Sequence, residues 1–583
     1  MSENTYPSVN DLTLEEKASL TSGGDAWHLQ GVEAKGIPGY MITDGPHGLR
    51  KSNSATTGEV DLNNSVPATC FPPAAGLSSS WNPELIHQVG EAMAEECIQE
   101  KVAVILGPGV NIKRNPLGGR CFEYWSEDPY LAGHEAVGIV AGVQSKGVGT
   151  SLKHFAANSQ ETDRLRISAN ISQRALREIY FPAFEHIVKE AQPWTIMCAY
   201  NCINGVHAAQ DRWLLTDVLR DEWGFQGIVM SDWGADHDRV ASLNAGLNLE
   251  MPPSYTDDQI VYAARDGRIQ PAQLDRMAQG MIDLVNKTRA AMSVENYRFD
   301  IEAHDEVAHQ AAVESMVLLK NDDAILPVAG DAKVTVIGEF ARTPRYQGGG
   351  SSHITPTKMT SFLDALTERG VDAKFAPGFT LDLEPADPAL EAEAVEAAKG
   401  ADVVLMFLGL PEAAESEGFD RETLDMPAKQ IALLEAVAAE NKNVVVVLSN
   451  GSVVTVAPWA KNAKGILESW LLGQSGGPAL ADVLFGKVSP SGKLAQTIPF
   501  DINDDPSTIN WPGEEGHVDY GEGVFVGYRY YDPYNKAVDY PFGFGLSYAT
   551  FEVSDVKAVK TGACTATVSA VVKNTSNVDA AET

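Results

Sequence analysis

The sequence predicts an α/β protein built from two successive strand–helix domains, the first of them a TIM-like (β/α) barrel. Short apolar runs recur along the chain without the alternation that marks a half-exposed strand. Amphipathic segments with a helical period separate these runs, which is the pattern of strand–helix units. In the N-terminal half, polar side chains directly follow several of the apolar runs. Together these three observations predict the α/β fold class.

The strands expected in the first domain are brief and wholly apolar. Clear examples are residues 102–106, 195–197 and 227–230. Because every side chain in such a run is apolar, both faces of the strand must be covered, as in a parallel sheet under helices. The sequence therefore predicts a buried parallel sheet between about residues 38 and 252.

The helices between these strands carry recognisable start signals. Asn82 followed by Pro83 is an N-cap followed by a proline at the first helical position. Apolar residues from 86 to 98 then follow a period of about 3.6. A second helical pattern follows Ser172, and Pro182 inside it should kink or restart the helix.

A closed barrel and an open doubly wound sheet both fit these units, and the polar residues favour the barrel. Polar groups at the ends of many strands would form a ring around one pocket. A doubly wound sheet would gather them at one crevice, usually behind a glycine-rich phosphate loop, and the first strand has no such loop. The strand-end residues are Asp44, Asn111, Arg114, Lys153, His154, Tyr200, Asn201 and Asp232.

We expect four regions along the chain. Residues 1–295 form the barrel, and residues 305–500 form a second α/β domain with strands near 334–337, 403–407, 444–448 and 465–467. Within that domain, Gly348–Gly350 lacks the context of a dinucleotide fingerprint and is expected to be a flexible loop. Residues 501–550 are expected to be an extended connection over the surface. Residues 551–583 suit one or two strands, too few for a complete β-sandwich.

Composition excludes several classes of function. The formal net charge of −35 makes nucleic acid or an anionic membrane a poor partner. Six scattered cysteines suit buried thiols better than a disulfide framework, and Cys198 with Cys202 lacks a second pair for zinc. The N-terminus has no secretory pattern and no apolar run is long enough to cross a bilayer, so we expect a cytoplasmic protein. A homo-oligomer is left open.

The predicted rim of the barrel suits the cleavage of a glycosidic bond. That reaction needs two carboxyl groups with different protonation and polar groups around a sugar. The rim offers Asp44, Arg120, Lys153, His154, Arg164 and Asp232, and Trp233 adds an aromatic face for sugar C–H groups.

Each of these residues also has an ordinary structural interpretation. Asp44 could belong to a turn, and Lys153 could pair with Glu161 or Asp163. His154 could be a core histidine, and Asp232 could cap the following helix.

Several long motifs, in order, resemble one enzyme family over essentially the whole chain. The sequence is similar to the β-glucosidases of glycoside hydrolase family 3. The matching stretches are 43–50 (TDGPHGLR), 115–124 (NPLGGRCFEY), 126–129 (SEDP), 153–164 (KHFAANSQETDR), 197–201 (MCAYN), 227–233 (GIVMSDW), 317–321 (VLLKN), 415–421 (ESEGFDR) and 540–548 (YPFGFGLSY).

The resemblance implies a fold and a role for each site residue. It implies a barrel, an α/β sandwich domain and the start of a fibronectin-type-III-like domain. Asp232 matches the nucleophile, and Glu417 matches an acid/base that the second domain supplies. The remaining positions match residues that clamp the sugar hydroxyls (Asp44, Arg120, Lys153, His154 and Arg164) and residues of the pocket wall (Met197 and Tyr200).

The expected reaction is a double displacement that retains the anomeric configuration of a terminal β-D-glucosyl residue. It requires carboxyl groups about 5–5.5 Å apart. We expect Asp232 to stay ionised beside cations and the pKa of Glu417 to be raised in a drier site. The residues alone do not separate Glu417 from Glu415 or from the more distant Glu468, and the whole acidic segment 412–425 could be a solvated loop.

The alternatives differ in substrate or in class. By the resemblance, Asp44 contacts the far end of a hexose, which favours glucosides, but a β-xylosidase or another exo-β-glycosidase stays open. A β-N-acetylglucosaminidase of the same family would carry a Lys-His-Phe-Pro-Gly-His-Gly-like motif where this chain has residues 153–158 (KHFAAN). A non-catalytic sugar-binding protein would lack one of the two carboxyl groups. No metal or organic cofactor is expected, and the partner is a small β-glucoside.

Overall fold

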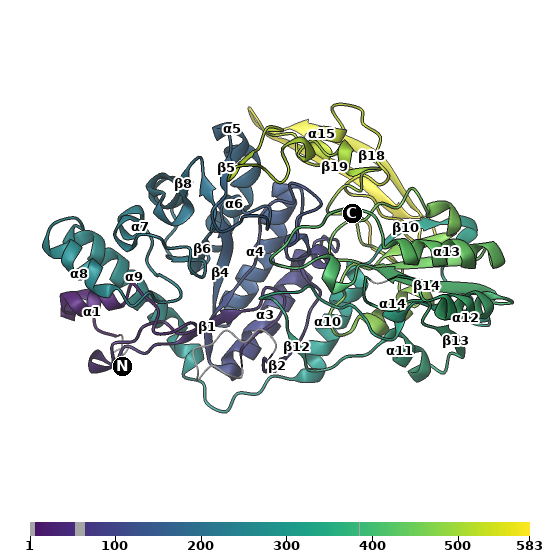
Figure 1. Cartoon of the computed structure of the whole chain (residues 1–583), viewed down its shortest axis with the longest axis horizontal. Coiled ribbons are helices and arrows are strands. Elements are labelled where there is room, and N and C mark those ends of the chain that lie inside the picture. The colour runs from purple at the N-terminus through teal and green to yellow at the C-terminus, as the bar shows by residue number, and fades with distance from the viewer. Residues whose placement is uncertain (1–5, 53–63, 384) are drawn as a thin grey trace.

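The computed structural model describes residues 6–52, 64–383 and 385–583. The N-terminal barrel-like domain occupies one end of the molecule, and the second α/β domain lies beside it (Figure 1). Each domain has its own large cluster of buried apolar side chains. The predicted α/β class is therefore confirmed.

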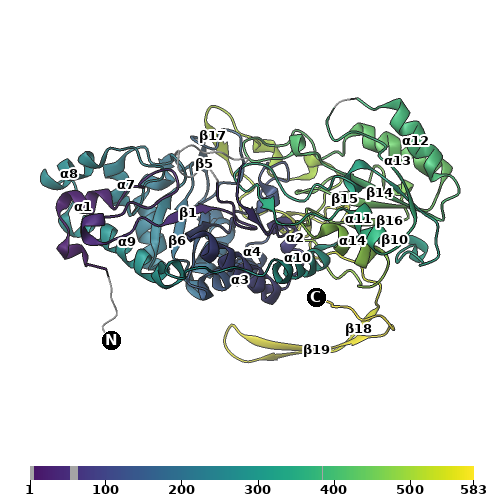
Figure 2. The ribbon, with the colours of Figure 1, turned by 90° about the horizontal axis from the view of Figure 1, so that it is seen from below.

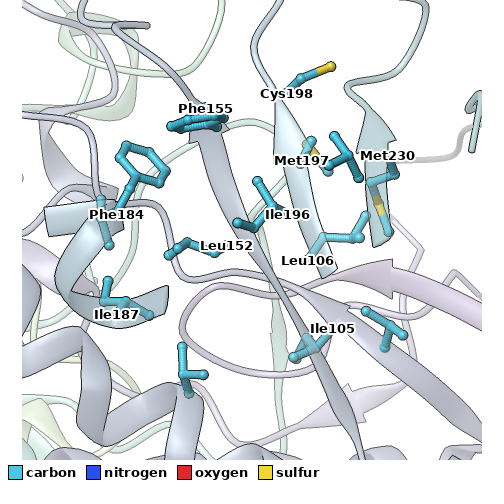
Figure 3. Packing of buried hydrophobic residues seen from close by; sticks show 14 of the residues in the cluster. Ile105, Leu106, Leu152, Phe155, Phe184, Ile187, Ile196, Met197, Cys198 and Met230 are labelled. Carbon is cyan, nitrogen blue, oxygen red and sulfur yellow. The ribbon is translucent and has the colours of Figure 1, made fainter. Parts of the chain in front are cut away.

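The first domain is organised around five parallel strands in the order β1-β3-β4-β6-β9. Every residue of these strands is buried, as expected for a sheet covered on both faces. Side chains such as Ile105, Leu152, Ile196 and Met230 belong to the buried apolar cluster around these strands (Figure 3). The strands are β1 (Met41–Asp44), β3 (Val102–Leu106), β4 (Gly149–Phe155), β6 (Thr195–Cys198) and β9 (Ile228–Ser231).

Isolated bridges, rather than further parallel strands, carry the ring beyond β9 in the described part of the chain. Leu249 bridges to β9, and the adjacent Glu250 bridges to Ser22. Antiparallel bridges then join Gly23 to Leu29, and His28 to Met41 of β1. The sheet thus curls into a barrel whose last section is irregular backbone, which differs from eight parallel strands.

Helices cover the outside of this curled sheet. Asn82 caps α3 (Pro83–Glu100) by accepting a hydrogen bond from the backbone N of Leu85 at 3.1 Å, as predicted. Pro182 begins α6 (Pro182–Ala191) after a π-helical stretch, which confirms the predicted restart. The other helices of the domain are α1 (Leu14–Ser19), α2 (Ala74–Leu77), α4 (Pro129–Ser145), α5 (Gln173–Ala175), α7 (Arg239–Ala245), α8 (Asp257–Arg265) and α9 (Pro271–Met292).

The second domain contains a six-stranded sheet in the order β10-β16-β15-β14-β11-β13. All neighbours are parallel except β10 with β16. The four apolar runs predicted here are strands β11 (Val334–Ile337), β14 (Val403–Gly409), β15 (Val444–Ser449) and β16 (Gly465–Glu468). The remaining elements are β10 (Val317–Asn321), β13 (Ala373–Ala376), α10 (Ile301–Ser315), α11 (Phe362–Glu368), α12 (Pro388–Ala398), α13 (Ala428–Glu440) and α14 (Gly476–Leu484).

The two domains are joined by backbone contacts as well as by side chains. Strand β12 (Thr355–Pro356) of the second domain pairs in parallel with β2 (Pro67–Ala68) of the first. At Gly119 the backbones approach so closely that an added Cβ would lie 1.8 Å from the carbonyl oxygen of Phe419. Only glycine fits there, so the segment that carries Glu417 lies directly on the barrel domain.

The segment 501–550 is more than the extended connection that we expected. Its strand β17 (His517–Asp519) pairs in parallel with β5 (Ser168–Asn170) of the barrel domain, and β5 continues to β7 (Cys202–Ile203) and β8 (Val206–His207). Glu522 forms a fully buried ion pair with Arg114 at 2.5 Å. A buried charge pair and a shared sheet make the part near residues 517–522 an integral layer of the first domain. The end of the segment contacts the second domain instead, where the backbone N of Leu546 donates to the backbone O of Leu318 at 2.9 Å. The segment also contains the short helix α15 (Tyr528–Tyr531).

The chain continues into an antiparallel hairpin formed by β18 (Phe551–Lys560) and β19 (Ala566–Asn574). The hairpin projects from the rest of the molecule (Figure 2), and most of its side chains are exposed. Among the described residues, no helix combines the length and the apolar character needed to cross a bilayer.

Candidate active site

A cavity of about 300 Å³ opens at the strand ends of the barrel. The ten residues predicted as catalytic pair, sugar clamp, pocket wall and aromatic face all line it, whereas Asn111, Arg114 and Asn201 of the predicted strand-end ring do not. Asp44 ends β1, Lys153 and His154 belong to β4, and Asp232 directly follows β9. Glu417 reaches the same cavity from the second domain, in the segment after β14. The cavity therefore has walls from both domains.

Asp232 lines the cavity, and one of its carboxylate oxygens is buried without a hydrogen-bond partner among the described residues. Its Oδ1 accepts a hydrogen bond from the backbone N of Trp233 at 2.8 Å. Its Oδ2 accepts none from the described residues and lies 3.7 Å from Nε2 of His154. The N-cap alternative is wrong, because the next helix, α7, is capped by Asp238.

Glu417 is held by charged and backbone donors. Its Oε1 accepts a hydrogen bond from Nη1 of Arg164 at 2.9 Å, and Nη1 of Arg120 lies 3.5 Å away. Its Oε2 accepts from the backbone N of Ser351 at 2.7 Å. Gly350 packs on the Glu417 side chain, where an added Cβ would come within 2.4 Å. The Gly348–Gly350 loop that was expected to be flexible is thus packed against this carboxylate.

The electrostatics of the two carboxyl groups reverse our expectation. Burial raises the pKa of Asp232, although Arg120, Lys153 and Arg164 oppose this shift. Burial would also raise the pKa of Glu417, but Arg120 and Arg164 outweigh it and hold that pKa well below its usual range. The prediction for Glu417 is wrong because the two guanidinium groups lie nearest to Glu417 rather than to Asp232.

The closed end of the cavity contains a set of buried charges. Nζ of Lys153 lies 4.0 Å from Asp44 and 4.0 Å from Glu123, so the structural alternative, a pair with Glu161 or Asp163, is not what the structure shows. Burial raises the pKa of Asp44 to about 6, against the attraction of Lys153 and Arg50. A carboxylate and an ammonium group facing a small cavity suit the donors and acceptors of sugar hydroxyls.

Neighbouring residues hold both the ring and the backbone of His154. Its Nδ1 lies 3.2 Å from the hydroxyl of Tyr124, and Asn111 bonds its backbone N and O at 2.8 and 2.9 Å. Burial, with nearby Arg120 and other cations, lowers its pKa well below the usual value. A neutral imidazole is therefore available to hydrogen-bond a ligand next to Asp232.

An aromatic wall faces these polar groups. Trp233 donates from Nε1 to the backbone O of Ala26 at 3.0 Å, and its ring lies 5.4 Å from that of Trp27. The hydroxyl of Tyr200 donates to the backbone O of Trp233 at 3.1 Å, and Met197 completes this side. Such a wall suits the apolar faces of a sugar ring.

The structure separates the three glutamates that the sequence left open. Glu415 lies outside the cavity and is buried against Arg345, with the backbone N of Gly451 also bonded to it. Glu468 bonds Asn450 and likewise does not line the cavity, although burial raises its pKa to about 8. Of the three, only Glu417 lines the cavity.

Sequence reasoning missed four residues of the cavity, namely Trp27, Gly350, Ser351 and Gly418. Gly350 and Ser351 adjoin a glycine run that could have been read as a loop approaching a ligand. Trp27 had no such signal, because its place depends on bridges between distant segments. Within the described residues, no three His, Cys, Asp or Glu side chains group closely enough to hold a metal ion.

The fold and this cavity define a barrel-type enzyme with two carboxyl groups from different domains. Residues 49–284 match the N-terminal domain of glycosyl hydrolase family 3, and residues 316–548 match its C-terminal domain. The chain belongs to glycoside hydrolase family 3.

Three similar proteins come from bifidobacteria. Two relatives, from Bifidobacterium breve and Bifidobacterium longum, are named exo-α-(1→6)-L-arabinopyranosidases. Each is 85% identical over 100% of this chain and 78% of its own length. A solved structure of a family 3 β-glucosidase from Bifidobacterium adolescentis is 87% identical with a TM-score of 0.96. The match covers 99% of this chain and 83% of the chain in the solved structure.

Proposed function

We propose that this chain is an exo-acting, retaining glycosidase that releases terminal α-L-arabinopyranosyl residues. The observation that carries the proposal is the 85% identity, over the full chain, to two exo-α-(1→6)-L-arabinopyranosidases. Our expectation of a β-glucosidase gives way here to the broader exo-glycosidase alternative.

The two substrate classes share the geometry that the carboxyl groups require. In their chair forms, an α-L-arabinopyranoside and a β-D-glucoside both carry an equatorial glycosidic oxygen on the same side of the ring. The arabinoside lacks the hydroxymethyl group and has an axial hydroxyl at C4. One nucleophile and one proton donor therefore serve either sugar, and the closed end near Asp44 and Lys153 discriminates between them.

In the proposed mechanism, the carboxylate of Asp232 attacks the anomeric carbon while Glu417 protonates the departing oxygen. Support comes from the unpartnered Oδ2 of Asp232 and from the location of both carboxyl groups on one cavity. Glu417 must gain a proton before this step. A bound sugar removes water from the site and offers hydroxyls to Arg164, and both effects weaken the stabilisation of ionised Glu417.

A comparison of aryl glycosides tests the proposal. The purified protein is assayed with 4-nitrophenyl α-L-arabinopyranoside, β-D-glucopyranoside and β-D-xylopyranoside, and kcat/KM is measured for each. We expect the arabinopyranoside to be preferred by roughly tenfold or more, which corresponds to about 1.4 kcal/mol of transition-state binding. A higher kcat/KM for the glucoside contradicts the proposed substrate. Proton NMR of the first product formed should show retained configuration, and inversion contradicts the double displacement.

A β-glucosidase is the second candidate, and one observation favours it. The solved structure at 87% identity is titled a β-glucosidase and superposes over 99% of this chain. The same three-substrate assay separates the candidates, because only the glucosidase gains from contacts to a hydroxymethyl group. A dominant kcat/KM for the glucoside would select this alternative.

A further inference from the structure

Glu161, which the proposed mechanism does not use, lies beside the proposed proton donor. Its side chain is 2% exposed, in the loop that follows β4. Oε2 of Glu161 accepts a hydrogen bond from Nη1 of Arg164 at 2.6 Å and another from the backbone N of Gly418 at 2.8 Å. Gly418 is the residue directly after Glu417. Glu161 therefore contacts both the backbone and the guanidinium partner of Glu417.

Arg164 is shared between two carboxylates through a single nitrogen. Its Nη1 lies 2.6 Å from Glu161 and 2.9 Å from Oε1 of Glu417. Two anions that share one cation compete for it, and the share of each depends on the charge of the other. Burial raises the pKa of Glu161 to about 7, despite nearby Arg120 and Arg164, and the charge of Glu417 adds to the shift.

Asp420 fixes the same loop to the second domain. Its Oδ1 accepts hydrogen bonds from the backbone N of Gly119 and of Glu161, both at 2.9 Å. Its Oδ2 accepts from the backbone N and the hydroxyl of Thr162 at 2.8 and 2.6 Å. The loop bearing Glu161 is thus tied to the segment bearing Glu417 by three bonds to Asp420 that do not involve Arg164.

We propose that Glu161 is a positioning residue for the proton donor, which it places through the N–H of Gly418 and whose charge it tunes by competing for Arg164. The inference rests on the proposed role of Glu417. When Glu161 is ionised, it draws Arg164 away from Glu417 and adds a negative charge nearby, so Glu417 holds its proton better.

The proton in question is transferred in the first chemical step. The Glu417 O–H bond breaks and its proton joins the glycosidic oxygen, while the C1–O bond breaks and Asp232 forms a new bond to C1. Glu417 leaves this step as a carboxylate, which the Arg120 and Arg164 pair then stabilises until water is deprotonated. Without the charge of Glu161, Glu417 would lose its proton at a lower pH.

The Glu161→Gln variant tests the charge while keeping an acceptor for Gly418. Because Glu417 gains its proton with the sugar bound, we expect the alkaline limb of the kcat profile to move to lower pH by roughly one to two units, as for two charges about 5 Å apart in a protein interior. At neutral pH, hydrolysis of a methyl glycoside should fall at least about tenfold, because its leaving group needs the proton. Hydrolysis of the corresponding dinitrophenyl glycoside should change little.

Asp163→Asn is the matched control. It removes the same charge two residues away, from a side chain that pairs only with exposed Arg166 among the described contacts. It should leave the alkaline limb in place. An unmoved limb in Glu161→Gln, or equal losses with both leaving groups, overturns the inference.

A second variant keeps the test decisive if Glu161→Gln does not fold. Glu161→Asp retains the charge but is too short to reach both Gly418 and Arg164. We expect a loss concentrated on the methyl glycoside, and equal losses on both substrates overturn the inference. Glu417→Gln separates this failure from failure of the proposed function. Full activity of Glu417→Gln on the methyl glycoside would show that Glu417 is not the proton donor. If Glu417→Gln is inactive but the alkaline limb of Glu161→Gln does not move, only the positioning role of Glu161 is refuted.

Discussion

Replacing Glu415 and Glu417 separately by glutamine should damage two different properties, although the residues are only two positions apart. Glu415 is 1% exposed and pairs with Arg345 at 2.6 Å, away from the cavity. Glu417 lines the cavity. The first substitution should therefore reduce stability, and the second should reduce turnover.

The size of the stability loss follows from the buried contacts of Glu415. Removing one partner of a buried ion pair costs about 3–5 kcal/mol. Glutamine still offers an acceptor to Gly451 or Ser452, which bond Glu415 at 2.5 and 2.8 Å, so we expect the lower end. A loss of about 3 kcal/mol in a domain of this size lowers Tm by about 6–12 °C.

The pH dependence has a defined sign. Burial raises the pKa of Glu415, but Arg345 and its other partners outweigh this and lower it below the usual value. Its contribution to stability is therefore present above the pKa of an unfolded glutamate, about 4.3, and is lost as pH falls further. The Tm difference between wild type and Glu415→Gln should shrink in acid.

Measurements of Tm and of kcat on a methyl glycoside together test the roles assigned to Glu415 and Glu417. Glu417→Gln should lower Tm less than Glu415→Gln does, because Arg164 keeps its ion pair with Glu161, and it should lose on the order of 10²–10⁴ in kcat. Azide should restore its turnover of an activated aryl glycoside by replacing the water that needs a general base. If Glu415→Gln unfolds like wild type but loses kcat to that extent, the assignment of the two glutamates is refuted.

Three further predictions concern other parts of the molecule. Asp232→Asn should lower kcat by on the order of 10⁴ or more, and near-normal turnover of an aryl glycoside would contradict a nucleophilic role. Asp44, whose pKa burial raises to about 6, must be ionised to accept hydrogen bonds, so kcat/KM should fall as pH drops through 6. That acid limb should disappear in Asp44→Asn, and its persistence would assign it to another group. Glu522→Gln leaves buried Arg114 without its ion pair and should destabilise the barrel domain by about 3–5 kcal/mol, which a lower Tm would show. An unchanged Tm would mean that this part of segment 501–550 is not an integral layer of the barrel domain.

The strands could be predicted from the sequence because a strand buried on both faces consists of consecutive apolar residues. Residues 102–106 and 444–448 are apolar throughout, and they correspond to the strands Val102–Leu106 and Val444–Ser449. The irregular closure of the barrel could not be predicted, because single bridges such as Ser22 to Glu250 have no pattern in either segment. The same holds for β17, a three-residue strand paired with residues about 350 positions earlier.

The members of the cavity could be predicted better than its electrostatics. Motifs identified all ten predicted residues, and all ten line the cavity. The charge of Glu417 depends on where the Arg164 side chain lies, and a shift of a few ångströms towards Asp232 would have produced the expected order of pKa values. The donor from Ser351 depends on the path of a loop 66 positions from Glu417.

The contact at Gly119 has a consequence for recombining domains of this family. A barrel from one relative joined to the second domain of another would have to reproduce a backbone approach that leaves no room for a side chain. Gly119→Ala in the natural chain imitates a poor junction, and it would push the proton donor away from the nucleophile while leaving each half correctly folded. Activity in such hybrids should therefore depend less on the two carboxyl groups than on the absence of a side chain at position 119, where the two domains meet.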